Sequence, residues 1–241
     1  MEVFGQPVPD GYEIPFVLTL ILITVKAGLS LFLLAKIAKR HQEQNVFALT
    51  FLGSVFLFML LAAIARVFYM IFDYFQTGFN VDLYADVPNI WFWKIGSLLS
   101  SFGIVIIIWV LDKKILGNKF KGIFAIIMAV GVIFQFVYPV NDFADFQFVS
   151  TIGVVASLGA FLIPILFFYI GANTPGLRKI AYAIAVGAII YTVGGAMVSA
   201  TFIAIFNEVL GFTTDIVYLI SISMKVAGLL AIAYGGVHFK T

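Results

Sequence analysis

Residues 221–236 read SISMKVAGLLAIAYGG and belong to an apolar segment, 214–237, that is long enough to cross a membrane and has a lysine halfway along it. Lys225 has mostly apolar residues on both sides. A charged side chain at mid-bilayer costs at least about 2.5–3.5 kcal/mol on insertion scales, so it normally faces a protein interior or a wet cavity. Lys225 is therefore our first candidate for a functional residue.

The composition of the whole chain agrees with a membrane segment at this position. Of 241 residues, 63% are hydrophobic and only 11% are charged, and the mean hydropathy is +1.11. Soluble domains carry about 25% charged residues. The chain has no cysteine, which excludes disulfides, thiolate nucleophiles and cysteine-based zinc sites. These values predict an integral membrane protein.

Apolar runs of suitable length occur throughout the chain. A helix needs about 20 residues to cross the hydrocarbon core. Runs of this length without alternating polarity indicate helices, because the strands of a barrel alternate. We therefore expect an all-α integral membrane protein with a single domain over 1–241. Its seven transmembrane helices are expected near 15–36, 46–72, 90–111, 120–140, 148–171, 179–206 and 214–237.

The loop charges predict the orientation of these helices. Basic residues fall in alternate loops and at the C-terminus, and the positive-inside bias makes those sides cytoplasmic. The remaining loops and the N-terminus carry acidic residues and no Lys or Arg. We expect a multi-pass protein of the cell membrane with its N-terminus outside and its C-terminus in the cytoplasm. The basic residues are Lys36, Lys39, Arg40, Lys113, Lys114, Lys119, Lys121, Arg178, Lys179 and Lys240.

Other residues within the spans predict local features of packing. Pro164 removes one helical hydrogen bond and is expected to kink the fifth helix. Gly194 and Gly195 give the sixth helix a small face for close contact with a neighbour. Aromatic residues near the outer ends of the spans are expected to form an interfacial belt. They are Tyr69, Tyr74, Trp91, Trp93 and Tyr138.

Four basic residues lie inside the expected spans, whereas the cores of the spans hold no acid. Such positive charge has to be neutralised, hydrated or matched by a ligand or a carbonyl group. Arg66 cannot lose its proton. Two of the lysines have a serine one helical turn away: Ser221 precedes Lys225 by four residues, and Ser30 follows Lys26 by four. The ligand-binding candidates are Lys225, Lys26, Ser221, Ser30, Arg66 and Lys94.

The depth of the four basic residues leaves alternatives open. Arg66 and Lys94 lie toward the outer end, where Arg66 could pair with Asp73 and Lys94 could extend to the surface. Lys26 and Lys225 lie deeper and face either a polar cavity or a hydrogen bond to a neighbouring helix. No cluster of residues suggests a metal or other cofactor, and we expect none.

Self-comparison finds a weak internal similarity. KIGSLL at 94–99 resembles KVAGLL at 225–230, and both expected helices run from outside to inside. Residues 53–73 also align with residues 187–207 at a few identical positions. Either shared apolar composition explains this, or helices one to three are repeated as helices five to seven with helix four as a linker, a 3+1+3 arrangement.

The layout of the spans resembles that of two families. Seven helices in a 3+1+3 arrangement with the N-terminus outside resemble the SWEET and PQ-loop transporters, although no Pro-Gln dipeptide occurs. That resemblance implies a central cavity between two triple-helix bundles. In length, orientation and its helix-seven lysine the chain is also similar to the microbial rhodopsins, which implies a retinal Schiff base on Lys225. No carboxylate counterion is in place for it, because Ser221 stands where one is expected and helix three has none in its core.

The remaining patterns narrow the functional classes. The sequence contains no GxSxG, Walker-type or HExxH motif, so we expect no enzyme, and no nucleic-acid partner. The first hypothesis is a membrane transporter or channel for a small polar or anionic solute, with buried lysines lining its cavity. The alternatives are a seven-helix membrane receptor or sensor with a cytoplasmic protein partner, and an accessory subunit whose lysines pair with acids of another membrane protein.

Overall fold

The computed structural model describes residues 2–3, 6–44 and 50–239, and nearly all of this part of the chain is helical. The start of the second expected span, at 46–49, and Lys240 lie outside the described residues. Two short strands, β1 (Glu2–Val3) and β2 (Gln6–Pro7), pair antiparallel before the first helix. The helices are α1 (Glu13–Gln44), α2 (Phe51–Met70), α3 (Asn89–Val110), α4 (Ile123–Val137), α5 (Phe143–Ser157), α6 (Leu162–Asn173), α7 (Arg178–Ala196), α8 (Ala200–Leu210) and α9 (Thr214–His238).

Short helical turns of other types extend or connect these helices. The π-helical segments η1 (Ile71–Gln76) and η3 (Leu111–Ile115) continue α2 and α3. The 3-10 segments are η2 (Val81–Leu83), η4 (Leu158–Phe161) and η5 (Pro175–Leu177). The expectation of an all-α protein is confirmed.

Within the described ranges, five helical stretches are long and apolar enough to cross a membrane. They correspond to the first, second, third, sixth and seventh expected spans. Their limits are Glu13–Gln42, Phe51–Gln76, Asn89–Ile115, Pro175–Ala196 and Thr214–His238.

The fourth and fifth expected spans form shorter helices. α4 has 15 residues instead of the whole of 120–140. The expected span 148–171 is not one helix, because η4 separates α5 from α6. Pro164 lies in the first turn of α6 and has no N–H to donate to the carbonyl oxygen of Ala160. The interruption expected at Pro164 is therefore present.

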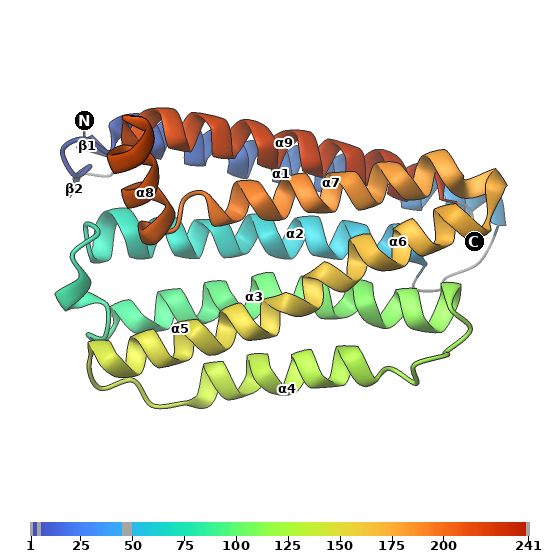
Figure 1. Cartoon of the computed structure of the whole chain (residues 1–241), viewed down its shortest axis with the longest axis horizontal. Helices are drawn as coiled ribbons and strands as arrows, with labels where there is room; N and C mark the ends of the chain where they lie inside the picture. The colour runs from blue at the N-terminus through green and yellow to red at the C-terminus, as the bar shows by residue number, and fades with distance from the viewer. Residues whose placement is uncertain (1, 4–5, 45–49, 240–241) are drawn as a thin grey trace.

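The sixth expected span, 179–206, is also divided, which corrects the prediction of a single helix there. α7 ends at Ala196, and a turn at Met197–Ser199 leads into α8. Gly194 and Gly195 weaken the last turn of α7, since glycine is a poor helix former. α8 ends at Gly211, whose φ of 66° is left-handed, and it contacts the start of α9. Figure 1 shows α8 folded across one end of the bundle.

The long helices contact one another in chain order and close into a ring. α1 packs on α2, α2 on α3, α3 on α4 and α4 on α5, while α6 packs on α7 and α7 on α9. α9 contacts α1 and completes the ring (Figure 1). The chain ends lie at opposite ends of this bundle (Figure 1). The internal repeat stays a prediction.

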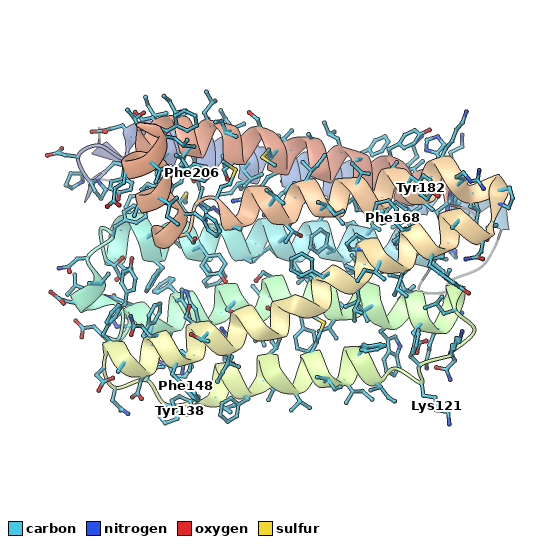
Figure 2. All side chains as sticks on the ribbon, viewed as in Figure 1. Lys121, Tyr138, Phe148, Phe168, Tyr182 and Phe206 are labelled. Carbon is cyan, nitrogen blue, oxygen red and sulfur yellow. The ribbon has the colours of Figure 1, made fainter. Side chains whose placement is uncertain are left out.

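The outward faces of the helices are apolar. On α4, Ile127, Val130 and Val137 are 63%, 61% and 65% exposed. Side chains of this kind project from the helices along much of the bundle, and the labelled basic residue, Lys121, lies at one end (Figure 2). A helix that exposes an apolar face of this size needs an apolar partner or lipid to cover it.

The closest helix contact joins α7 and α9. An added Cβ atom at Gly228 would lie 2.6 Å from the carbonyl oxygen of Gly187 and 2.7 Å from the backbone nitrogen of Tyr191. Ser221 donates a hydrogen bond of 2.5 Å from Oγ to the carbonyl oxygen of Gly194. Glycine thus allows the backbones of α7 and α9 to approach, and this contact fixes the position of α9 against α7 in the ring.

Candidate functional site

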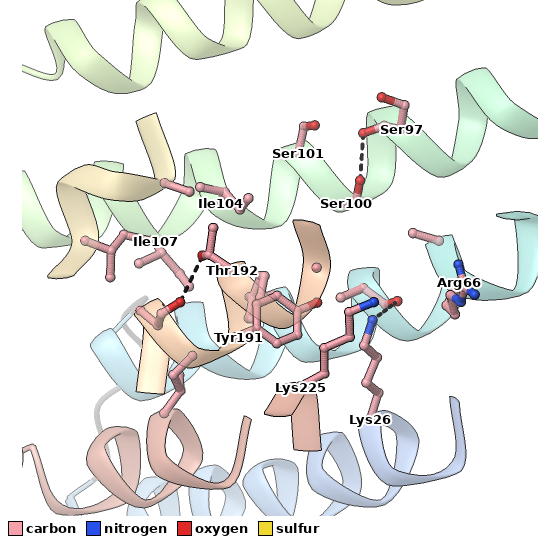
Figure 3. Close-up of a pocket in the computed structure, with 18 of the residues that line it drawn as sticks. Lys26, Arg66, Ser97, Ser100, Ser101, Ile104, Ile107, Tyr191, Thr192 and Lys225 are labelled. Atoms are coloured by element: carbon pink, nitrogen blue, oxygen red, sulfur yellow. Dashed lines mark hydrogen bonds between the residues drawn. The ribbon is translucent and has the colours of Figure 1, made fainter. Parts of the chain in front are cut away.

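A cavity of about 610 Å³ lies inside the ring of helices. α1, α2, α3, α4, α5, α6, α7 and α9 all contribute side chains to its lining. Its volume falls in the range of roughly 300–1,000 Å³ that is typical of pockets for small molecules. Most of the lining is apolar, but three basic side chains, Lys26, Arg66 and Lys225, reach it from three different helices (Figure 3).

Lys26 is held in place by contacts between α1 and its neighbours. Its Nζ donates a hydrogen bond of 3.1 Å to the carbonyl oxygen of Ala62 on α2. The same Nζ lies 5.8 Å from the centre of the Tyr191 ring on α7, within range of a cation–π contact. Ser30 donates from Oγ to the carbonyl oxygen of Lys26 at 2.8 Å and is not part of the cavity lining. Ser30 thus bonds its own helix.

Lys225 lies halfway along α9 and points toward the same part of the cavity as Lys26 (Figure 3). Its side chain is buried, with 8% of the residue exposed. Among the residues that the structure describes, Lys225 makes no hydrogen bond or ion pair. Ser221, expected beside it, uses its hydroxyl to bond Gly194 and does not line the cavity.

Arg66 lies at the side of the cavity closer to η1. Its Nη2 donates a hydrogen bond of 3.0 Å to Oγ1 of Thr19, and its Nη1 lies 3.9 Å from Oδ2 of Asp73. Its Nε is buried and has no hydrogen-bond partner in the part of the chain that the structure describes. The pairing of Arg66 with Asp73 expected as an alternative is therefore present, but it is long and leaves part of the guanidinium free.

Lys94 lies outside the cavity lining, although it was grouped with the other basic candidates. Its Nζ donates a hydrogen bond of 2.6 Å to the carbonyl oxygen of Tyr138, the residue that ends α4. The same Nζ lies 5.2 Å from the centre of the Trp91 ring. Lys94 thus donates a hydrogen bond to a carbonyl group at the C-terminal end of α4, which is a structural role.

Polar side chains of α3 and α4 form a second part of the lining. Ser97 donates from Oγ to Oε1 of Gln135 at 2.8 Å, and Nε2 of Gln135 donates to the carbonyl oxygen of Val149 at 3.1 Å. Gln135 thereby links α3, α4 and α5. Ser100 and Thr192 donate to carbonyl oxygens of their own helices, at Ser97 and Ala188 (Figure 3).

Several residues of the cavity were not identified from the sequence as site residues. Tyr69 and Trp93 were expected in an interfacial belt, but both line the cavity. Tyr74, from the same expected belt, is 2% exposed and therefore faces the protein interior. The belt was predicted only from the position of these residues near the ends of the expected spans. That position does not show whether an aromatic ring faces the lipid or the protein interior. Tyr191 and Gln135 carried no sequence pattern that would have marked them.

The electrostatic balance of the cavity is positive. In the part of the chain that the structure describes, Asp73 is the acid paired with a basic residue of the lining, and no acid lines the cavity itself. The described residues contain no group of three or more His, Asp or Glu side chains that could hold a metal ion. The arrangement is suited to an anion, which would receive hydrogen bonds from Lys225 and the free part of Arg66.

Comparison of the chain with family models, with curated proteins and with solved structures finds no match.

Proposed function

We propose that this protein is a multi-pass membrane transporter that binds a small anion in the cavity among its helices and carries it across the bilayer. The observation that carries the proposal is the convergence of Lys26, Arg66 and Lys225 on one cavity whose described lining residues include no acid. An uncompensated charge in a membrane interior is unfavourable and is usually retained for a function. A bound anion would compensate it.

The proposed membrane topology has seven spans, which adds two to the five long apolar helices. α5, η4 and α6 together cover 143–173, a length of roughly 45 Å at 1.5 Å per residue, which is sufficient to span a membrane. α4, at about 22 Å, would need slight thinning of the bilayer or coverage of its ends by the flanking loops. The protein would then have seven spans, with its N-terminus outside and its basic loops in the cytoplasm, as the loop charges predict.

Interrupted helices beside the cavity support transport in particular. Ala160 and Phe161 of η4 line the cavity, as do Ala196 and Ser199 at the break between α7 and α8. Non-helical backbone at membrane depth is tolerated where it is buried or lines a water-filled space. In transporters such breaks commonly border the substrate site and allow one part of the bundle to move against another.

The experiment is uptake of labelled anions into proteoliposomes. Chloride, phosphate and a series of carboxylates serve as probes, with wild-type protein, Lys225→Met and Lys94→Met. Lys94 is the matched control because it is a buried lysine outside the cavity. We expect uptake of at least one anion that Lys225→Met reduces by tenfold or more and Lys94→Met leaves within about twofold of wild type, once the amount of folded protein is equal.

Two other outcomes would replace the proposal. Saturable anion binding that depends on Lys225 without any flux would make the protein a receptor or sensor. Failure of every anion to bind, together with an isolated protein that is unstable without another membrane protein, would indicate an accessory subunit.

A further inference from the structure

The polar and apolar residues of the cavity are separated along the bundle axis. On α2, Arg66 and Val55 both line the cavity and lie about 16 Å apart along the helix. On α3, Ser97 and Ile107 lie about 15 Å apart. Arg66 and Ser97 share one end of the cavity, and Ile107 lies at the other (Figure 3). Because α2 runs antiparallel to α3, Val55 lies at the same end as Ile107.

The other helices follow the same division. On α9, Lys225 is seven residues, or about 10 Å, from Ile232, which lines the apolar end. On α7, Thr192 and Ile184 lie in the corresponding order, because α7 runs antiparallel to α9. Beyond the level of Lys225, the described lining is mostly apolar, and Thr192, which also lies beside Ile104 and Ile107, uses its hydroxyl to bond the carbonyl oxygen of Ala188 (Figure 3). The apolar side chains are Phe51, Val55, Ile104, Ile107, Phe161, Ile163, Ile184 and Ile232.

A ligand that matches this cavity needs two unlike parts. A compact hydrophilic anion would satisfy the basic end and leave the apolar end unfilled. An uncharged apolar molecule would fill the apolar end and leave the amine of Lys225 without a partner among the described residues. We infer that the ligand is an amphipathic organic anion, a carboxylate attached to an apolar chain, with the carboxylate at Lys225 and the chain extending toward Ile107 and Ile232. This inference rests on the proposed function and specifies its substrate class.

The contacts of the basic residues indicate where the carboxylate would bind. Lys26 already donates to Ala62, and Arg66 already contacts Thr19 and Asp73. Lys225 has all its donors available among the described residues. The carboxylate would therefore bind Lys225 first, with Lys26 and Arg66 adding positive potential nearby.

Binding of a homologous series to the protein in lipid nanodiscs tests the inference. The probes are acetate, butanoate, octanoate and methyl octanoate, which has the same chain without the charge. Burial of one methylene gives about 0.8 kcal/mol, which is roughly fourfold in affinity. We expect affinity to rise by up to about fourfold per methylene through octanoate, and methyl octanoate to bind at least tenfold more weakly than octanoate.

Substitutions at the basic end and at the apolar end of the cavity test the inferred position of the ligand independently. Lys225→Met should weaken octanoate by tenfold or more, while the control Lys94→Met should leave it unchanged. Ile104→Ser, at the apolar end, should weaken octanoate severalfold and leave butanoate little changed, because the shorter chain does not extend that far. The series on the wild-type protein decides the question even if a variant fails to fold.

The outcomes separate this inference from the proposed function. Lys225-dependent binding of acetate or inorganic anions without any gain from chain length would overturn the inference and leave an anion transporter in place. Equal binding of octanoate and its methyl ester would also overturn it. No Lys225-dependent binding of any anion would overturn both.

Discussion

Lys26 donates a hydrogen bond of 3.1 Å from Nζ to the carbonyl oxygen of Ala62, which ties α1 to α2 at the edge of the cavity. Lys225 lies on α9, which packs against α1, and it makes no such hydrogen bond among the described residues. The two lysines line the same cavity, but only the Lys26 amine is hydrogen-bonded among the described residues. Lys26 is part of the scaffold as well as of the lining, whereas Lys225 is available to a ligand.

This difference predicts opposite effects of the same substitution on stability. Lys26→Met loses a hydrogen bond between helices, so we expect the free energy of unfolding to fall by roughly 0.5–1.5 kcal/mol without ligand. Lys225→Met removes a buried charge without a partner, so stability should stay the same or rise. Thermal unfolding of the ligand-free protein in one detergent measures both. A Lys225→Met protein less stable than Lys26→Met would mean that Lys225 has a structural partner.

The close contact between α7 and α9 predicts that alanine substitutions at two glycines change stability in opposite directions. At Gly228, an added Cβ would meet backbone atoms of Gly187 and Tyr191, which cannot move without separating the helices. We expect Gly228→Ala to destabilise the protein by roughly 1–3 kcal/mol. Gly28→Ala on α1 is the control, because no atom lies within 4 Å of its added Cβ, and it should gain about 0.5–1 kcal/mol from helix propensity. Equal melting temperatures for the two variants would contradict this close approach of α7 and α9.

Sequence reasoning identified the features that depend on composition and depth. The all-helical fold follows from long apolar runs, and the sharing of one cavity by Lys26 and Lys225 follows from the difficulty of hiding a deep charge in lipid. Pro164 was expected to disturb its helix, and the helix is interrupted there because proline lacks the N–H that Ala160 would need.

The direction in which each side chain points could not be predicted. Ser221 lies one turn from Lys225, yet its hydroxyl bonds to α7, because a single sequence does not show which neighbour a helix face meets. Lys94 was grouped with Lys225 by depth, but the nearby end of α4 takes its amine. Gly195, predicted to contact a neighbouring helix with Gly194, lines the cavity instead. All three positions depend on how the helices are rotated about their axes, which is a property of tertiary packing.

Tyr84 predicts a dependence of stability on alkaline pH. It lies in the loop after η2, outside the apolar spans, where burial and then the charge of Asp73 raise its pKa from 10.0 to about 12. The folded protein therefore favours the neutral phenol, and this contribution to stability is complete below pH 10 and is lost as the pH rises from 10 to about 12. We expect the melting temperature of wild type to fall more steeply over this range than that of Tyr84→Phe.

Tyr84→Phe is a suitable variant because the ring contacts remain. The Tyr84 ring lies 5.0 Å, centre to centre, from both Phe72 and Phe146, and phenylalanine can keep these contacts. The two proteins should therefore melt at similar temperatures near pH 9. Parallel curves from pH 9 to pH 12 would show that the phenol of Tyr84 ionises as freely in the folded protein as in the unfolded chain.

Pro164 predicts how the interrupted helix contributes to transport. Because Pro164 leaves the carbonyl oxygen of Ala160 without its helical donor beside the cavity, the segment between α5 and α6 can bend at low energetic cost. Pro164→Ala restores the donor, so we expect the free energy of unfolding to rise by up to about 3 kcal/mol and uptake to slow severalfold. The dissociation constant of the transported anion should change little, because the cavity keeps its basic residues.

Pro175→Ala is the control for Pro164→Ala. Pro175 begins η5 in the loop between α6 and α7, so its substitution should affect neither stability nor uptake. Uptake by Pro164→Ala at the wild-type rate, measured with binding in the same preparation, would make the break a static feature and assign the transport motion to another part of the bundle, of which the turn between α7 and α8 is the next to test.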